Sequence, residues 1–122
     1  MTATAPPPAD RSPNVVVLSG NLLLASRVRG LVQTLGGRCR IAGKLPDEPE
    51  PLTHVFLDLA TRSKLTADVP VLCRGRFPDA MTVAYGPHVE VDRLAAAREA
   101  GFDRVMTNRE FDGGVRELLG GS

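Results

Sequence analysis

Five short apolar runs alternate with polar, glycine- or proline-bounded segments along the chain. The central one, residues 54–59 (H-V-F-L-D-L), and the first, residues 14–19 (N-V-V-V-L-S), are almost continuously apolar. Such runs predict interior strands of a parallel sheet, which are buried on both faces. Residues 38–42 alternate polar and apolar side chains, which predicts an edge strand with one wetter face. The last two predicted strands are residues 81–85 and 102–107.

Segments with helical periodicity follow four of these strands. The first is expected between a capping turn at residues 19–21 and the helix-ending glycines at 36–37. The second is expected from a cap at Asp68, with Pro70 in its first turn, to about Arg76. The others are expected over residues 89–100, closed by Gly101, and over residues 110–119. The apolar positions expected to face the core are Leu24, Val28, Leu31, Leu35, Phe111, Val115, Leu118 and Leu119.

The connection between the second and third strands differs from the others. Residues 44–53 (K-L-P-D-E-P-E-P-L-T) hold three prolines, which leave room for at most one turn of helix. Five strands alternating with helices predict an α/β fold, a three-layer α/β/α sandwich with a shortened second crossover. The expected strand order is 2-1-3-4-5. This order places any ligand or chemistry at the carboxyl ends of the first and third strands.

Size and composition bound the class of protein. The 122 residues fit one domain, predicted at 13–122, after a disordered Ala/Pro/Thr-rich tail at 1–12. No apolar run approaches the roughly 20 residues that span a bilayer. The N-terminus lacks the basic-then-apolar order of a secretion signal. A cytoplasmic protein without membrane contact is therefore expected.

Charge and cysteine content exclude two further kinds of site. Net charge is +1, which gives no general attraction to nucleic acid. Cys39 and Cys73 lie in no metal-ligand spacing, which favours two reduced, partly buried thiols over a disulfide. Six arginines would form one patch only if the first predicted helix and the helix predicted at 68–76 met at the second strand. Without aromatic platforms, a solvated face is favoured over a nucleic-acid site for Arg27, Arg29, Arg38, Arg40, Arg74 and Arg76.

The order of the elements resembles a response-regulator receiver domain. Residues 82–119 combine a strand, a charged alanine-rich helix, the sequence A-G-F-D, a short strand and a last amphipathic helix. V-V-V-L-S-G-N at the first strand and F-L-D-L at the third fit the front half, so the resemblance covers about residues 14–119. It implies a flavodoxin-like fold and a role in signal transduction.

The resemblance also implies a phosphorylation site, which this sequence matches only in part. Receivers accept a phosphoryl group on the aspartate that ends the third strand, which is Asp58 here. They hold Mg²⁺ with an acidic pair after the first strand, where this chain has Leu18, Ser19 and Gly20. The hydroxyl residue of the fourth strand would be Tyr85. Receivers carry a lysine after the fifth strand, where this chain has Asn108, or Arg109 if the turn is one residue longer.

These departures leave several interpretations of the candidate residues. Asp58 can be a structural carboxylate bound by loop amides or Arg109, a group that binds another ligand, or an atypical phospho-acceptor. His88 can cap the helix expected at residue 89, or pair with Asp58 in acid–base or metal chemistry. His54 is expected at the surface. Ser19 and Asn21 form a turn and cap, or an anion cradle. The crevice candidates besides Asp58 are thus Ser19, Asn21, Tyr85, His88, Asn108 and Arg109.

The sequence therefore predicts a degenerate, pseudo-receiver-like regulatory domain that is not an enzyme and needs neither cofactor nor metal. Its expected partner is another protein or a second copy, bound through residues 89–119. Two alternatives remain open: an atypical response regulator phosphorylated at Asp58, and a small enzyme or metal binder built on Asp58 and His88.

Overall fold

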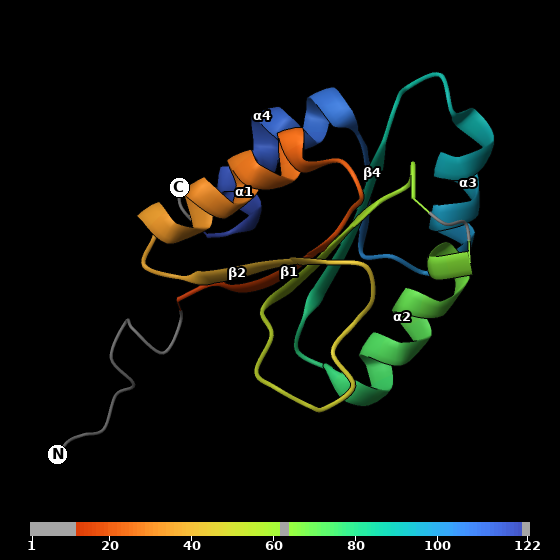
Figure 1. Ribbon diagram of the computed structural model, residues 1–122. Coiled ribbons are helices and arrows are strands. Elements are labelled where there is room, and N and C mark those ends of the chain that lie inside the picture. The colour runs from red at the N-terminus through yellow and green to blue at the C-terminus, as the bar shows by residue number, and fades with distance from the viewer. Residues whose placement is uncertain (1–11, 62–63, 121–122) are drawn as a thin grey trace, which may run out of the picture.

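The computed structural model describes residues 12–61 and 64–120, so the tail predicted at 1–12 lies outside it apart from Ser12. One parallel five-stranded sheet has the order β2-β1-β3-β4-β5, as predicted (Figure 1). The strands are β1 (Asn14–Leu18), β2 (Arg38–Ala42), β3 (His54–Asp58), β4 (Met81–Gly86) and β5 (Arg104–Thr107).

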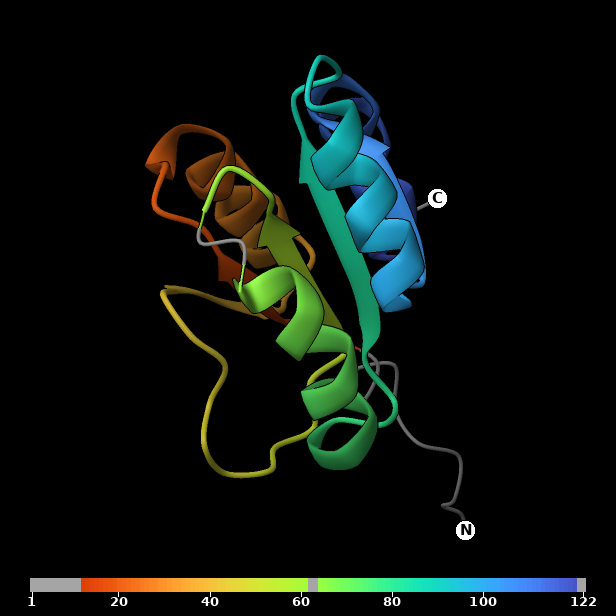
Figure 2. The ribbon, with the colours of Figure 1, turned by 90° about the vertical axis from the view of Figure 1, so that its right-hand side faces the viewer.

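Helices cover both faces of this sheet, which confirms the three-layer α/β/α sandwich. Helices α1 and α4 lie on one face, and α2 and α3 lie on the other (Figures 1 and 2). None of the helices in the described part of the chain is long and apolar enough to cross a membrane. The four helices described are α1 (Leu22–Thr34), α2 (Lys64–Arg76), α3 (Val91–Ala100) and α4 (Asn108–Leu118).

Alternation along the strands divides the core into two layers. In β3, Val55 and Leu57 pack toward α2 and α3, whereas Phe56 packs toward α1 and α4. Successive side chains of a strand point to opposite faces, so a continuous apolar run fills both layers. The predicted helix stripes contribute as expected, since Val28, Phe111, Val115 and Leu119 are buried and Leu24, Leu31, Leu35 and Leu118 pack at the edge of the same layer.

The two cysteines belong to different layers, which excludes a disulfide between them. Cys39 lies at the edge of the α1/α4 layer and Cys73 is buried in the α2/α3 layer. Both are free, as predicted. Burial raises the pKa of each thiol to about 11, so neither is present as the reactive thiolate near neutral pH.

The second crossover contains no helix, in agreement with its three prolines. Residues 43–53 instead form a winding loop on the α2/α3 side of the sheet (Figure 1). Leu45 and Leu52, near its two ends, are 5% and 3% exposed and pack into that layer. Two leucines thus provide the apolar contacts that a helix supplies in the other crossovers.

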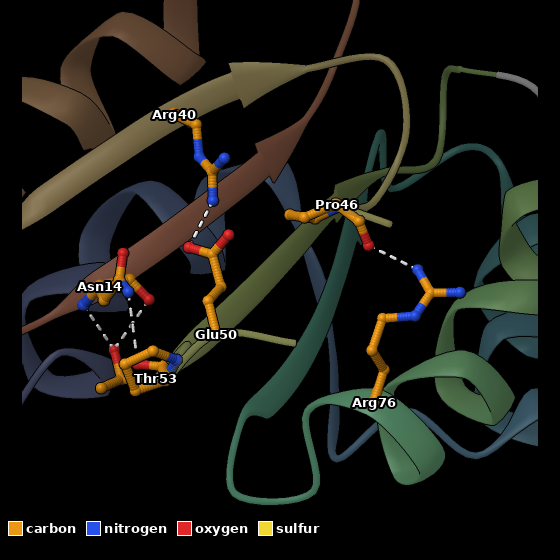
Figure 3. A network of polar contacts seen from close by, with 7 residues as sticks. Asn14, Arg40, Pro46, Glu50, Thr53 and Arg76 are labelled. Atoms are coloured by element: carbon orange, nitrogen blue, oxygen red, sulfur yellow. Dashed lines mark hydrogen bonds and ion pairs between the residues drawn. The ribbon is translucent and has the colours of Figure 1, made fainter. Parts of the chain in front are cut away.

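Polar contacts hold the same segment against neighbouring elements (Figure 3). Arg40 of β2 forms an ion pair with Glu50, and Arg76 at the end of α2 donates to the Pro46 carbonyl. At its end, the Thr53 amide donates to the Asn14 carbonyl at 2.8 Å. The segment is therefore attached to β1, β2 and α2, and has a defined path.

Helix α2 begins four residues before the predicted cap. Asp68 lies inside the helix and does not cap it, and Pro70 is buried in its interior. A proline there removes one backbone hydrogen bond. Leu65 and Val69 pack against the core from this helix, and their burial offsets that loss.

The starts of the last two helices also differ from prediction. Helix α3 begins at Val91 instead of residue 89, because the Glu90 amide donates to the Pro87 carbonyl in a preceding turn. Helix α4 begins two residues early, at Asn108, because Thr107 caps it. Thr107 and Glu110 exchange hydrogen bonds in a capping box. Gly101 ends α3 in the left-handed conformation, as predicted.

The arginines do not gather into one patch. Because α1 and α2 lie on opposite faces, the condition for convergence is not met. Arg27 pairs with Asp112 of α4 at 3.0 Å. Arg40 and Arg76 contact Glu50 and the Pro46 carbonyl of the second crossover. The arrangement agrees with separate surface arginines.

Candidate functional site

Asp58 ends β3 at the carboxyl edge of the sheet and is 7% exposed. Its Oδ2 atom accepts a hydrogen bond from Ser19 Oγ at 2.8 Å, and its Oδ1 atom accepts one from the Ala60 amide at 2.9 Å. Strand β1 lies directly beside β3, which brings Ser19 to Asp58. Both carboxylate oxygens therefore have partners within the protein, one of them a loop amide and neither of them Arg109.

Ser19 and Asn21 form the turn that leads into α1. The Asn21 amide donates to Ser19 Oγ at 3.0 Å, and Asn21 Oδ1 accepts from the Leu23 amide at 2.9 Å. Asn21 is thus the N-cap of α1, as the sequence predicts. The hydroxyl of Ser19 has one proton and two acceptors within reach, Asp58 Oδ2 at 2.8 Å and the Asn21 carbonyl at 3.0 Å. The carboxylate is the closer of the two and is charged, so it takes the proton.

A cavity of about 620 Å³ opens over these groups. It lies at the carboxyl ends of β1, β2 and β3, and includes the point between β1 and β3 where the strand order reverses. Ligands of open α/β sheets bind at this place. The lining residues are Leu18, Ser19, Gly20, Asn21, Gly43, Lys44, Asp58, Ala60, Thr61 and Leu65.

His88, Asn108 and Arg109 line a different cavity. It has a volume of about 460 Å³ and lies beyond β4 and β5, with Pro87 and Thr107 as its other walls. Arg109 is the second residue of α4, so the fifth strand is not followed by the longer turn that would direct it to Asp58. The predicted crevice is therefore two cavities, and His88 and Asp58 line separate ones.

His88 does not cap the helix that follows it. Helix α3 begins three residues later, with Glu90 at its N-cap position, and His88 is exposed in the preceding turn. The capping interpretation is therefore wrong. It failed because the turn at Pro87 delays the start of the helix.

Tyr85 is a core residue behind the larger cavity. It is 1% exposed, and its ring stacks on Phe111 with centroids 4.2 Å apart. Burial raises the pKa of its hydroxyl, the charge of Asp58 adds to this, and the nearby Ser19 hydroxyl offsets part of it. The hydroxyl makes no hydrogen bond with any described residue. Tyr85 therefore lies near Ser19 and Asp58 without lining their cavity.

His54 is buried, contrary to its predicted surface position. It is 9% exposed, with Nε2 2.6 Å from the Leu118 carbonyl and Nδ1 2.8 Å from Thr53 Oγ1. A neutral imidazole can be buried when both ring nitrogens are paired. Burial lowers the pKa of His54, and the hydrogen bond to Leu118 acts in the opposite direction. Its place at the start of the central strand was predicted, but its partners, the Leu118 carbonyl of α4 and the Thr53 hydroxyl, were not.

This burial predicts a pH dependence of stability. Below about pH 6.5 the unfolded chain protonates His54, whereas the folded protein resists protonation. The stability contributed by neutral His54 is present above that pH and is lost as pH falls through the lowered folded pKa. Urea denaturation at about pH 7.5 and about pH 5.5 should give a smaller free energy of unfolding at the lower pH. His54→Gln should flatten this difference, and His88→Gln, at an exposed position, should retain it.

Metal-ligand clusters are absent from the described residues: no three His, Cys, Asp or Glu side chains gather where one ion could contact them all. Among the residues that the structure describes, Asp58 is the one carboxylate in the lining of the larger cavity. Hard divalent cations prefer several oxygen ligands, usually with more than one carboxylate for an all-protein site. The cavity thus offers an incomplete set for such an ion.

No family model matches the chain, and no curated protein sequence matches it. Solved structures do. A response regulator from Burkholderia pseudomallei, with a phosphorylated aspartic acid, calcium ion and citrate, superposes with a TM-score of 0.68 at 18% identity, covering 88% of this chain and 66% of that one. A response regulator from Thermotoga maritima gives 0.67 at 16% identity, covering 89% and 98%. The beryllofluoride-activated NtrC4 receiver domain dimer gives 0.59 at 14% identity, covering 88% and 96%.

The chain has the receiver-domain fold. Within this fold, Asp58 ends the third strand, where the resemblance puts the phospho-acceptor. Ser19 directly follows the first strand, where the resemblance puts the acidic pair. Asn108, expected in the place of the lysine, is the first residue of α4. The fold and the position of Asp58 therefore agree with the resemblance, and the surrounding charges differ from it.

Proposed function

We propose that this receiver-type domain is a non-catalytic regulatory module that binds another protein without Mg²⁺-dependent phosphorylation of Asp58. One observation carries the proposal. The Ser19 hydroxyl donates to Asp58 Oδ2 at 2.8 Å, at the strand end where the resemblance expects a metal-binding carboxylate. A neutral hydroxyl thus partners the aspartate in place of a metal-bound acidic pair.

The charges around Asp58 support the same conclusion. Phosphoryl transfer depends mainly on positioning and on neutralising charge on the phosphoryl oxygens. Asp58 is the one carboxylate among the described residues of its cavity, and Arg109, the alternative cation, lines the other cavity. Lys44 lies at the cavity, but its side chain is 76% exposed and its Nζ atom is 3.6 Å from Asp47 Oδ2. Neither cation contacts Asp58.

Phosphodonor treatment tests this proposal. Incubation of the full chain with acetyl phosphate and Mg²⁺ should give no mass gain of one phosphate, because no metal-binding pair accompanies Asp58. Intact-mass spectrometry under mild acid, which preserves acyl phosphates, measures this directly. Asp58→Asn is the matched control and should likewise show no added phosphate. A stable phosphate gain in the wild type that Asp58→Asn lacks would contradict the proposal and favour the phospho-accepting alternative.

The surface formed by residues 89–119 is the proposed interface. Helix α3, strand β5 and helix α4 form this surface at the β5 edge of the sheet (Figure 1). Val89 and Val91, beside and at the start of α3, are 69% and 64% exposed, so this surface presents two apolar side chains to solvent. Exposed apolar side chains are buried when proteins associate. A second copy of the chain is one candidate partner, since the beryllofluoride-activated NtrC4 receiver domain, which shares this fold, is a dimer.

Matched charge substitutions test this surface. Val91→Glu should weaken self-association about tenfold or more, because an unpaired carboxylate in an interface is costly. Val71→Glu, on α2 outside the surface and 59% exposed, should leave it unchanged. Sedimentation equilibrium over a range of concentrations measures both. Equal losses would contradict the choice of surface, and a wild type that stays monomeric throughout would exclude a second copy as the partner.

A further inference from the structure

The carboxylate of Asp58 has acceptor capacity that the protein does not use. An ionised carboxylate offers about four lone-pair sites. Ser19 and Ala60 occupy one on each oxygen, and the side chain lines the cavity of about 620 Å³ while being 7% exposed. A charge that is more than nine-tenths buried therefore adjoins a space large enough for a small molecule.

The neighbouring hydroxyl groups add acceptors more than donors. The proton of Thr61 Oγ1 is donated to the Asp58 carbonyl at 2.8 Å, and the proton of Ser19 is donated to the Asp58 carboxylate. Each hydroxyl thus presents oxygen lone pairs as its remaining hydrogen-bonding capacity. The polar part of the cavity consequently suits a ligand that donates hydrogen bonds.

Among the described residues of the lining, Lys44 is the other charged side chain, and the two charges are not equivalent. Its side chain is 76% exposed, and its ammonium lies 3.6 Å from the Asp47 carboxylate. A solvent-exposed charge is screened, whereas a buried charge acts through a lower dielectric. At the positive end of α1, the Leu23 amide already donates to Asn21 Oδ1, so this amide is not free to bind an anion. Asp58 therefore determines the charge of a complementary ligand, which is positive.

The rest of the cavity determines the body of that ligand. Leu18, Ala60 and Leu65 provide apolar walls, and glycine at positions 20 and 43 leaves space beside them. No helix follows β2, so Gly43 and Lys44, at the start of the second crossover, form the wall on that side. The volume falls within the range of about 300–1,000 Å³ typical of small-molecule sites.

We propose that this cavity binds a small organic monocation, a primary ammonium on a short aliphatic chain. The ammonium donates to the Asp58 carboxylate and to Thr61 Oγ1, and the aliphatic chain packs against Leu18 and Leu65. A single carboxylate balances one positive charge, which favours a monocation over a divalent metal. The inference rests on the proposed function in one respect, that Asp58 carries no phosphoryl group.

A titration with three matched probes tests this site. Hexylammonium, 1-hexanol and hexanoate share one aliphatic body and differ in charge. Amide-resolved NMR of the full chain should show saturable shifts at residues 19–21, 43–44 and 58–61 with hexylammonium. Hexanol should bind about tenfold more weakly, since it lacks the charged hydrogen bond, and hexanoate should not bind.

Two variants and a shorter probe complete the test. Asp58→Asn keeps the shape and should weaken hexylammonium binding about tenfold or more, whereas Asp79→Asn, in an exposed turn, should not change it. Propylammonium should bind more weakly than hexylammonium, by up to about fourfold per methylene removed. Equal binding of the three probes, tighter binding of hexanoate, unchanged binding to Asp58→Asn, or no saturable shift would overturn the proposal. These outcomes are separate from the phosphate mass gain that would overturn the proposed function.

Discussion

Replacing Phe111 with alanine is expected to lower the free energy of unfolding by about 4 kcal/mol. Phe111 is fully buried, stacks on Tyr85 with centroids 4.2 Å apart, and meets Phe56 edge-on at 5.0 Å. It is the residue through which α4 reaches the two central strands β3 and β4. Its removal leaves a cavity bordered by two rings that cannot move into it without losing their own contacts.

Urea denaturation followed by circular dichroism gives the required free energies. A domain of this size has a total stability of about 5–15 kcal/mol, so the loss would leave about 1–11 kcal/mol and lower the urea midpoint. Phe111→Leu is the matched control, since it keeps an apolar side chain and should cost about 1.5 kcal/mol. A loss below about 1 kcal/mol for Phe111→Ala would mean that α4 is not held by this aromatic contact.

Replacing Gly37 with alanine is the second large effect. A Cβ atom there would lie 2.3 Å from the Pro13 carbonyl oxygen and 3.0 Å from its carbon. These are backbone atoms at the start of β1, and the same carbonyl accepts from the Arg38 amide at 2.8 Å. Relief of the clash requires separating the first residues of β1 and β2, at a cost of about 3 kcal/mol.

Gly113→Ala provides the opposite control for this experiment. A Cβ at Gly113 meets nothing within 4 Å inside α4, so alanine should stabilise the helix by about 1 kcal/mol. The two variants add the same methyl group and should move the urea midpoint in opposite directions. A neutral Gly37→Ala would show that the chain around Pro13 adjusts freely, and that the close approach there does not require glycine.

The strands and their order were predictable because each strand is a self-contained apolar run. Val15, Val17 and Phe56 fill one layer while Val16 and Val55 fill the other, and this double burial is visible in the sequence as the absence of polar positions. Handedness rules then restrict how five such strands can be joined. The absence of a helix at residues 44–53 followed from the prolines alone.

Helix starts were predicted less well, because competing local signals decide them. Asp68 and Pro70 suggested a start for α2, but burial of Leu65 extends the helix in the N-terminal direction. For α4 the correct signal was present, since Thr107 and Glu110 have the spacing of a capping box. The resemblance competes with that signal, because it places a site residue at Asn108, inside the helix.

The candidate site was predictable on one side only. Adjacent strands β1 and β3 bring Ser19 to Asp58, as their predicted order implies. Arg109 follows β5, which lies two strands from β3, a lateral distance of about 10 Å at the usual strand spacing. Such a distance makes a contact with Asp58 dependent on the exact path of one turn, and sequence alone does not specify that path.

Because the second crossover has no helix, we expect the two halves of the sheet to differ in local stability. Helices α2 and α3 cover one face over β3 to β5, whereas β1 and β2 depend there on Leu45 and Leu52. Few contacts have to break to detach this segment, so it opens at a lower free energy than the sheet as a whole. We therefore expect amide hydrogens of residues 44–53 to exchange with solvent before those of β3 and β4, and proteases to cut there before they cut within the sheet.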